Sequence, residues 1–256
     1  MKRAAIVYFS GTGNTKFIAD NMKSVLNERG ISTDLINIEK DTMLCQNYDY
    51  LIIGAPIYVD RYPEKLLDYL KITLKKYSKK CMLFSTQSYD KPTCAFQDLI
   101  NRVPFIDVSY CEFISMPNNF YNFMFKKRTK EEENKLIEEA VKKSKQAVNS
   151  YLAGEKQIYH KSFLEVEFVN IVYNLFYPYI TKRMTNNITI DLNKCIHCKL
   201  CEMNCPTNCI KVSNKASFND RCLLCQRCMN NCPKGAFLYK NRVYKKYNPN
   251  FKFLNK

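Results

Sequence analysis

The chain has 256 residues, of which 46% are hydrophobic and 25% charged, with 13 cysteines, no tryptophan and a formal net charge of +16. This length suits one to two domains, and the ordinary apolar fraction excludes collagenous, low-complexity and wholly disordered chains. No apolar stretch reaches the roughly 18–20 residues that a spanning helix needs, and the N-terminus lacks a signal-peptide core. We therefore expect a cytoplasmic protein whose reduced thiols serve metal binding or catalysis.

The first part of the chain alternates apolar runs with helical patterns. Strands are expected at residues 4–9, 31–38, 50–54, 81–85 and 108–115, and helices at 15–29, 63–77 and 92–102. Because each parallel pair of strands needs a helical crossover, this order predicts an α/β domain with a doubly wound parallel sheet. A capping box of Thr129 and Glu132 opens one more helix, which should end near Gly154. We place the first domain at residues 1–154.

Residues 155–187 are expected to connect this domain to a second one. Within them, the segment 162–184 is aromatic and apolar, but it contains two glutamates and Pro178, which make a membrane span unfavourable. We interpret the segment as a helix packed between two domains. A helix lying on a membrane surface, with basic residues at its end, is the alternative.

Eight cysteines follow in two sets with the same spacing. Each set is C-x-x-C-x-x-C-x-x-x-C-P: Cys195, Cys198, Cys201 and Cys205, then Cys222, Cys225, Cys228 and Cys232. Three thiolates at this spacing can each reach one iron of a cuboidal cluster, whereas the fourth lies too far along the chain and reaches the other cluster. The predicted assignment is therefore interleaved, with Cys232 completing the first cluster and Cys205 completing the second.

This pattern resembles the bacterial two-cluster ferredoxins over about residues 188–240, which implies an α+β domain with two 4Fe-4S clusters. Structural zinc also favours C-x-x-C pairs, but it does not explain the third cysteine at the same interval or the repeated Cys-Pro ending. Cys209 departs from the family pattern, since the second half has Ala236 at the corresponding position. We interpret Cys209 as a small buried hydrophobe outside the ligand sets.

Positive charge is concentrated in the same region. Residues 182–256, which include a basic tail at 241–256, hold 15 basic and 3 acidic residues, whereas residues 1–181 hold 25 and 21. A basic tail first suggests nucleic acid, but two oxidised clusters of about −2 each offset part of the excess. We therefore expect no nucleic-acid partner, and the remaining charge faces an acidic redox partner or solvent.

A second motif lies between the first strand and the first helix. It joins two glycines to small polar residues: Ser10, Gly11, Thr12, Gly13, Asn14 and Thr15. The glycines permit a tight turn, and the helix N-terminus offers free N–H groups to an anion. Lys16 stands where a dinucleotide-binding turn has its third glycine, and the lysine of a Walker loop is missing. Neutral donors suit a single terminal phosphate; a Ser/Thr-rich capping loop without a ligand is the alternative.

The loop resembles the FMN-phosphate loop of flavodoxins. That resemblance implies a five-stranded sheet of order 2-1-3-4-5, with FMN at the carboxyl ends of the strands. The loops at residues 54–63 and 85–90 should reach the same edge, and in flavodoxins such loops hold the isoalloxazine. By position, the candidate flavin contacts are Pro56, Ile57, Tyr58, Thr86, Gln87 and Tyr89. Both tyrosines would fit exposed surface turns equally well. The loop at 85–90 contains no glycine, which departs from the usual flavodoxin pattern. Residues 116–120, after the fifth strand, are expected to form a third wall of the flavin site.

Taken together, the motifs make nearly the whole chain resemble a flavodoxin–ferredoxin fusion. Clusters carry single electrons and FMN accepts one or two, so we predict an iron–sulfur flavoprotein that transfers electrons to or from a redox partner protein. The alternative is an FMN-dependent reductase of a small molecule, such as a quinone or nitro compound, fed by its own clusters. A third interpretation is a sensing module whose clusters report oxygen or iron. The sequence contains no acid/base dyad, hydrolytic triad or Rossmann fingerprint.

Overall fold

The computed structural model describes residues 1–40, 47–74, 77 and 79–251, and these form two compact units. The first unit consists of the described parts of 1–117 and 129–169, together with Asn250 and Phe251. The second unit consists of residues 118–128 and 170–249. Both units are therefore discontinuous in sequence, a feature of which the composition gave no sign.

The first unit is built on a parallel sheet. Within the described residues its five strands are β1 (Arg3–Tyr8), β2 (Ser32–Asn37), β3 (Tyr50–Pro56), β4 (Lys80–Gln87) and β5 (Asp107–Ser115). Their order is β2-β1-β3-β4-β5, and every neighbouring pair is parallel. This confirms the doubly wound parallel sheet expected from the alternation of strands and helices, and the strand order that the resemblance implied.

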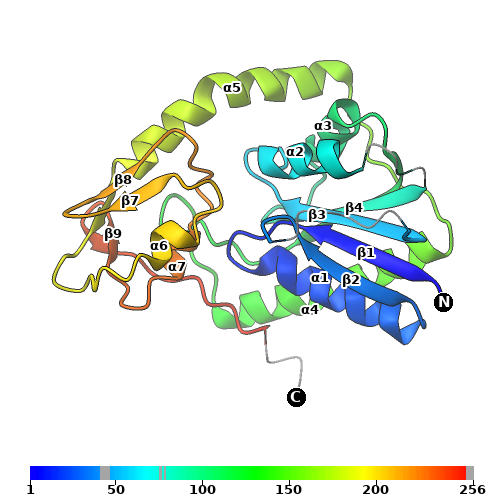
Figure 1. Ribbon diagram of the computed structural model, residues 1–256, viewed down its shortest axis with the longest axis horizontal. Coiled ribbons are helices and arrows are strands. Elements are labelled where there is room, and N and C mark those ends of the chain that lie inside the picture. Colours follow the sequence, from blue (N-terminus) through cyan, green and yellow to red (C-terminus); the bar gives the residue numbers. More distant parts are fainter. Residues whose placement is uncertain (41–46, 75–76, 78, 252–256) are drawn as a thin grey trace. The chain divides into compact units, whose positions relative to one another are not determined.

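Helices cover both faces of this sheet, which is why β1, β3 and β4 are buried almost throughout. The helices are α1 (Asn14–Glu28), α2 (Glu64–Thr73), α3 (Ala95–Arg102) and α4 (Lys130–Leu152). α1 and α4 lie on one face, and α2 and α3 lie on the other (Figure 1). α2 ends earlier than expected, and residues 75–76 of the expected helix lie outside the described residues.

The predicted start of α4 is confirmed in atomic detail. The Thr129 hydroxyl accepts a hydrogen bond from the Glu132 N–H at 3.2 Å, and the Glu132 carboxylate accepts one from the Thr129 N–H at 2.8 Å. Two backbone donors that the helix cannot satisfy itself are thereby paired. The helix ends at Leu152, and Gly154 follows with a φ of +80°.

One glycine in the sheet is required by packing. A Cβ built on Gly54 would lie 2.0 Å from the ring of Phe84 on the neighbouring strand. Phe84 is fully buried, so its ring has little room to move. Gly54 therefore lets two strands that end at the candidate site pack closely.

The connecting helix α5 (Phe163–Thr185) forms over the segment that was ambiguous in sequence. Packing buries Val166, Tyr177, Thr181 and Thr185, and the Tyr177 hydroxyl donates to the Leu223 carbonyl at 2.9 Å. Eight other large apolar residues of this helix are exposed: Phe163, Leu164, Phe168, Ile171, Leu175, Phe176, Tyr179 and Ile180. The packing of the helix between two domains stays a prediction. The helix has apolar side chains on all of its faces, so burial of one face leaves those on the other faces exposed. Among the described residues, no helix has the length and apolarity to cross a membrane.

The second unit contains only short elements. Its strands are β6 (Ile188–Ile190), β7 (Ile210–Val212), β8 (Ala216–Phe218), β9 (Phe237–Tyr239) and β10 (Arg242–Val243), and its short helices are α6 (Leu200–Met203) and α7 (Arg227–Asn230). The strands pair antiparallel as β10-β9-β6 and β7-β8. The expected α+β character of this part of the chain is confirmed.

Candidate functional site

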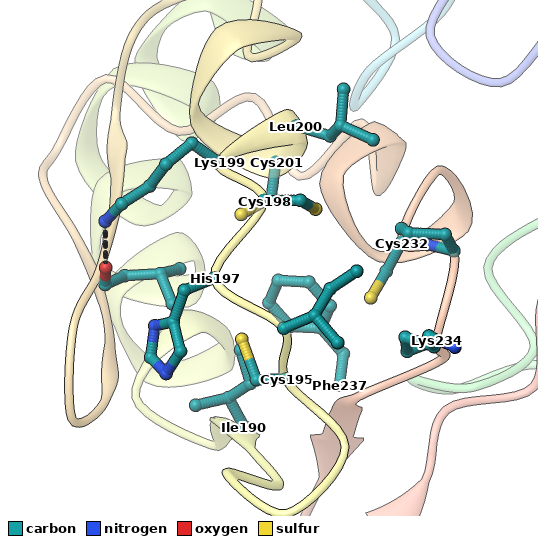
Figure 2. Close-up of a pocket in the computed structure, with 13 residues that line it drawn as sticks. Ile190, Cys195, His197, Cys198, Lys199, Leu200, Cys201, Cys232, Lys234 and Phe237 are labelled. Atoms are coloured by element: carbon teal, nitrogen blue, oxygen red, sulfur yellow. Dashed lines mark hydrogen bonds between the residues drawn. The ribbon is translucent and has the colours of Figure 1, made fainter.

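The eight predicted ligand cysteines lie around two cavities. Cys195, Cys198, Cys201 and Cys232 line one cavity, and Figure 2 shows their thiol side chains reaching it from different sides. Cys205, Cys222, Cys225 and Cys228 line the second cavity. Each cavity is thus lined by the first three cysteines of one set and by the fourth cysteine of the other set.

The backbone curls around both cavities in the same way. His197 and Leu224, each two residues after the first cysteine of a set, have φ values of +50°. Lys199 and Gln226, which precede α6 and α7, have φ values of +60° and +61°. Such left-handed residues turn the chain sharply. This repeated turning lets three closely spaced cysteines face one cavity.

Backbone N–H groups are aimed at several of the sulfur atoms. The N–H of Cys209 donates to Cys205 Sγ at 3.3 Å, and the N–H of Ala236 donates to Cys232 Sγ at 3.4 Å. The N–H of Leu224 donates to Cys222 Sγ at 3.4 Å. Donors of this kind stabilise negative charge on sulfur and tune a bound cluster.

Three thiols that line the second cavity have raised pKa values. The neighbouring Cys209 thiol, followed by burial, raises the pKa of Cys205 to about 12. Burial raises the pKa of Cys225 to about 11 and that of Cys228 well above its ordinary value. A thiol ligand must lose its proton, so iron loading of this cavity releases protons.

Four thiols around a volume, with N–H donors to sulfur, form the donor set of an iron–sulfur cluster. Among the described residues, no three His, Cys, Asp or Glu side chains are placed to hold a single metal ion. Basic groups lie close to the cysteine segments. Lys199 Nζ binds Glu202 and the Val212 carbonyl, and Lys246 Nζ binds the Cys232 carbonyl. The thiols and N–H donors therefore fit the predicted clusters, whereas the charge of Lys199 is paired with Glu202.

The predicted phosphate loop forms the turn into α1. Ser10 Oγ accepts hydrogen bonds from the N–H groups of Gly13 and Lys16, both at 3.2 Å. Gly13 has a φ of +109°, a conformation that a side chain would strain. The turn thus presents the N-terminus of a 15-residue helix at the carboxyl end of β1, where the helix dipole favours an anion.

Two polar contacts tie this loop to the carboxyl ends of β4 and β5. Thr15 Oγ1 and Thr86 Oγ1 are 2.7 Å apart, and both side chains are buried. Asn14 Nδ2 donates to the Pro117 carbonyl at 3.2 Å. The loops after β1, β4 and β5 therefore meet at one edge of the sheet, as the resemblance implied. The direct contacts of Ser10, Thr12 and their neighbours with a phosphate stay predictions.

The loop after β3 contains a strained turn. Tyr58 and Arg61 exchange backbone hydrogen bonds at 2.8 and 3.2 Å, and the two residues between them, Val59 and Asp60, have φ values of +48° and +58°. Positive φ is unusual for a β-branched residue such as valine, and such strain concentrates at functional sites. Tyr58 is half-buried on this turn, and its predicted flavin contact stays a prediction.

A buried ion pair that the sequence motifs did not indicate anchors this turn. Arg61 Nε lies 3.3 Å from Asp98 Oδ2, and both side chains are buried. Glu64 adds a weaker contact, 3.7 Å from the Arg61 guanidinium. No local signal marks this pair, since 37 residues separate the partners. The pair connects the loop after β3 to α3.

The loop after β4 is held by its own polar groups. Gln87 accepts from Ser85 Oγ at 3.0 Å and donates to the carbonyls of Tyr89 and Lys91 at 3.1 and 2.6 Å. Ser115 Oγ also donates to the Tyr89 carbonyl, at 3.0 Å. These bonds hold the backbone of the loop, while the Tyr89 side chain remains 58% exposed. Ile57, whose N–H donates to the Thr86 carbonyl at 3.3 Å, follows Pro56 at the same edge.

The expected third wall, residues 116–120, divides between the two units. Met116 is buried in the core of the first unit. Phe120 instead packs in the second unit, against a cluster of Cys209, Cys222 and Leu224. The apolar contacts of Phe120 thus lie beside the cysteines, and its role as a wall of the flavin site stays a prediction.

Comparisons with known proteins agree with this organisation. The Flavodoxin domain family matches residues 5–98, and two families described as 4Fe-4S binding domain match residues 188–211 and 219–237. Among solved structures, the chain is similar to a flavodoxin from the domain Archaea, with 12% identity, 58% of this chain and 97% of that chain covered, and a TM-score of 0.42. Flavodoxin 1 from Bacillus cereus is 19% identical, with 59% of this chain and 98% of that chain covered and a TM-score of 0.43. A flavoprotein in complex with FMN from Lactobacillus acidophilus is 16% identical, with 44% of this chain and 93% of that chain covered and a TM-score of 0.35.

Proposed function

We propose that this chain, an iron–sulfur flavoprotein with a flavodoxin domain followed by two 4Fe-4S binding domains, passes electrons between its FMN, its two clusters and a redox partner protein. The flavodoxin domain implies FMN, and the two ferredoxin-type domains imply two 4Fe-4S clusters. When bound, these groups link one-electron to two-electron transfer. The protein supplies their binding, orientation and electrostatic environment.

In this proposal the thiols around each cavity hold one cluster. Cys232 completes the first set of three and Cys205 the second, and the N–H groups of Ala236 and Cys209 stabilise those two sulfurs. The phosphate of FMN binds at the turn that Ser10 and Gly13 shape. The ion pair of Arg61 and Asp98 keeps the strained turn after β3 in place for the flavin ring.

The observation that carries the proposal is the short segment between the two sites. In the first unit, the Pro117 carbonyl accepts a hydrogen bond from Asn14 of the phosphate loop. In the second unit, Phe120 packs against the cluster of Cys209, Cys222 and Leu224, and Cys222 is a predicted ligand of the second iron–sulfur cluster. Only two residues of chain separate Pro117 from Phe120. One short segment of the chain thus has a contact with the phosphate loop at one end and with the cysteine cluster at the other.

Charge favours an acidic protein as the partner. Residues 182–256 carry an excess of 12 basic residues, and two oxidised clusters offset only about four charges. A basic surface attracts an acidic carrier and accelerates its association at low salt. Raising the ionic strength should slow electron delivery from an acidic ferredoxin more than reduction by a neutral dye.

Rapid-mixing kinetics under anaerobic conditions test the proposal. The clusters are reduced with a substoichiometric pulse of dithionite, and the flavin and cluster absorbances are followed separately. We expect a phase in which flavin is reduced as the clusters are reoxidised, with a rate independent of protein concentration. A rate proportional to protein concentration would mean transfer between molecules and would contradict the proposal. Steady-state turnover of quinones or nitro compounds with the same donor would instead identify a small-molecule reductase.

A further inference from the structure

The second cysteine cavity is lined by five thiols, one more than a cluster needs. The additional thiol is Cys209, whose Sγ lies 3.4 Å from Cys205 Sγ. Cys209 is 5% exposed and packs with Cys222, so it contacts two predicted ligands of the same cluster. The interpretation of Cys209 as a small buried residue is thus correct for its burial, but its sulfur lies inside the candidate metal site.

The first cavity provides an internal comparison. Ala236 stands four residues after Cys232, as Cys209 stands four residues after Cys205. Both backbone N–H groups donate to the preceding cysteine sulfur, at 3.4 and 3.3 Å. The local backbone is therefore the same in both halves, and the difference between the two cavities at this position is the thiol of Cys209.

We propose that Cys209 is a reserve ligand of the second cluster, able to take the iron that Cys205 holds. In the exchange, the bond from iron to Cys205 Sγ breaks and a bond to Cys209 Sγ forms. The proton of the Cys209 thiol passes to Cys205, so neither the charge nor the oxidation state of the cluster changes. A change of side-chain rotamer moves a sulfur over a distance comparable with the separation of these two atoms. The first cluster has alanine at this place and cannot exchange in this way.

Two single variants form a matched pair for the test. Cys205→Ala and Cys232→Ala each remove the ligand that completes a cluster. Iron and acid-labile sulfide are counted anaerobically, and the EPR spectrum of the reduced protein identifies the clusters that remain. We expect Cys205→Ala to retain nearly all its iron, with an altered signal from the second cluster only. Cys232→Ala should lose about half of its iron.

Two further variants test whether the Cys209 thiol itself supplies the replacement ligand. Cys205→Ala combined with Cys209→Ala should lose about as much iron as Cys232→Ala, whereas Ala236→Cys should restore iron to Cys232→Ala. Equal iron loss in the two single variants would overturn the proposal. So would iron retention in the double variant, because a ligand from outside the protein would then hold the cluster. Changes confined to the first cluster in Cys205→Ala would contradict the interleaved sets themselves. These experiments measure iron and sulfide content, so their outcome does not depend on whether electrons pass between the cofactors.

Discussion

The two units of the chain are stabilised in different ways. The first has strands of six to nine residues buried between helices, with a core of aliphatic and aromatic side chains. The second has strands of two or three residues, and its small apolar cluster packs against the cysteines of both sets. We therefore expect apolar burial to stabilise the first unit and metal binding to stabilise the second. The comparison predicts that the units respond differently to the same perturbation.

Removal of iron should produce the largest difference. Anaerobic chelation is expected to unfold the second unit, since metal binding supplies most of the folding free energy of a small metal-centred unit. The first unit should keep a cooperative thermal transition in circular dichroism. Limited proteolysis checks which part has opened, with cleavage expected within residues 188–240 and protection of the sheet. Loss of both transitions together would show that the units do not fold independently.

Breaking the buried ion pair of the first unit should have the next largest effect. Asp98→Ala leaves the Arg61 guanidinium buried without its nearest carboxylate, which costs about 3–5 kcal/mol of unfolding free energy. FMN affinity should fall as well, because the turn after β3 loses its anchor. Asp20→Ala, which breaks the exposed pair with Lys16, is the control and should cost roughly 0–1 kcal/mol. Equal effects of the two variants in urea titrations would contradict the role of burial.

Overpacking the sheet at Gly54 should have a smaller effect. Gly54→Ala places a methyl group against the Phe84 ring and is expected to cost about 1–3 kcal/mol. The iron content of the second unit should not change. Adding Phe84→Leu to the variant relieves the clash and should recover part of the lost stability, as measured by thermal unfolding. If the double variant loses the sum of the stabilities lost by the two single variants, the clash with Phe84 is not the cause of the destabilisation.

The smallest effect is expected from the helix cap of α4. Thr129→Ala removes the acceptor for the Glu132 N–H, and a lost N-cap costs about 1 kcal/mol. Thr129→Ser keeps that acceptor and should be nearly neutral. Urea midpoints of the two variants, compared with the unchanged chain, measure the difference. Equal destabilisation by serine and alanine would show that the Thr129 hydroxyl does not stabilise the helix.

Features that are local in sequence could be predicted. The spacing of the two cysteine sets is covalent, and it indicated both the kind of metal site and which thiols gather around each cavity. The strand and helix alternation likewise predicted the sheet, because each crossover is short. The order of the strands and the FMN loop came from the resemblance to flavodoxins, which the Ser10–Thr15 motif carries.

Contacts between distant residues could not be predicted. The pairing of Arg61 with Asp98 depends on how α3 packs, and the position of Phe120 beside Cys222 depends on a segment that changes units. Phe251, in the basic tail at residues 241–256, stacks on Phe17 of α1 with ring centroids 4.2 Å apart. Tertiary packing decides such contacts, and periodicity in one sequence carries no signal for them.

Whether one chain holds a flavin together with two clusters is tested most directly by a count of cofactors in protein purified without oxygen. FMN, iron, acid-labile sulfide and zinc are quantified in the same sample. We expect one FMN per chain with about eight irons and eight sulfides, and EPR signals of two interacting clusters after reduction. Zinc in place of iron, or a chain that binds no flavin when its clusters are intact, would contradict this cofactor content.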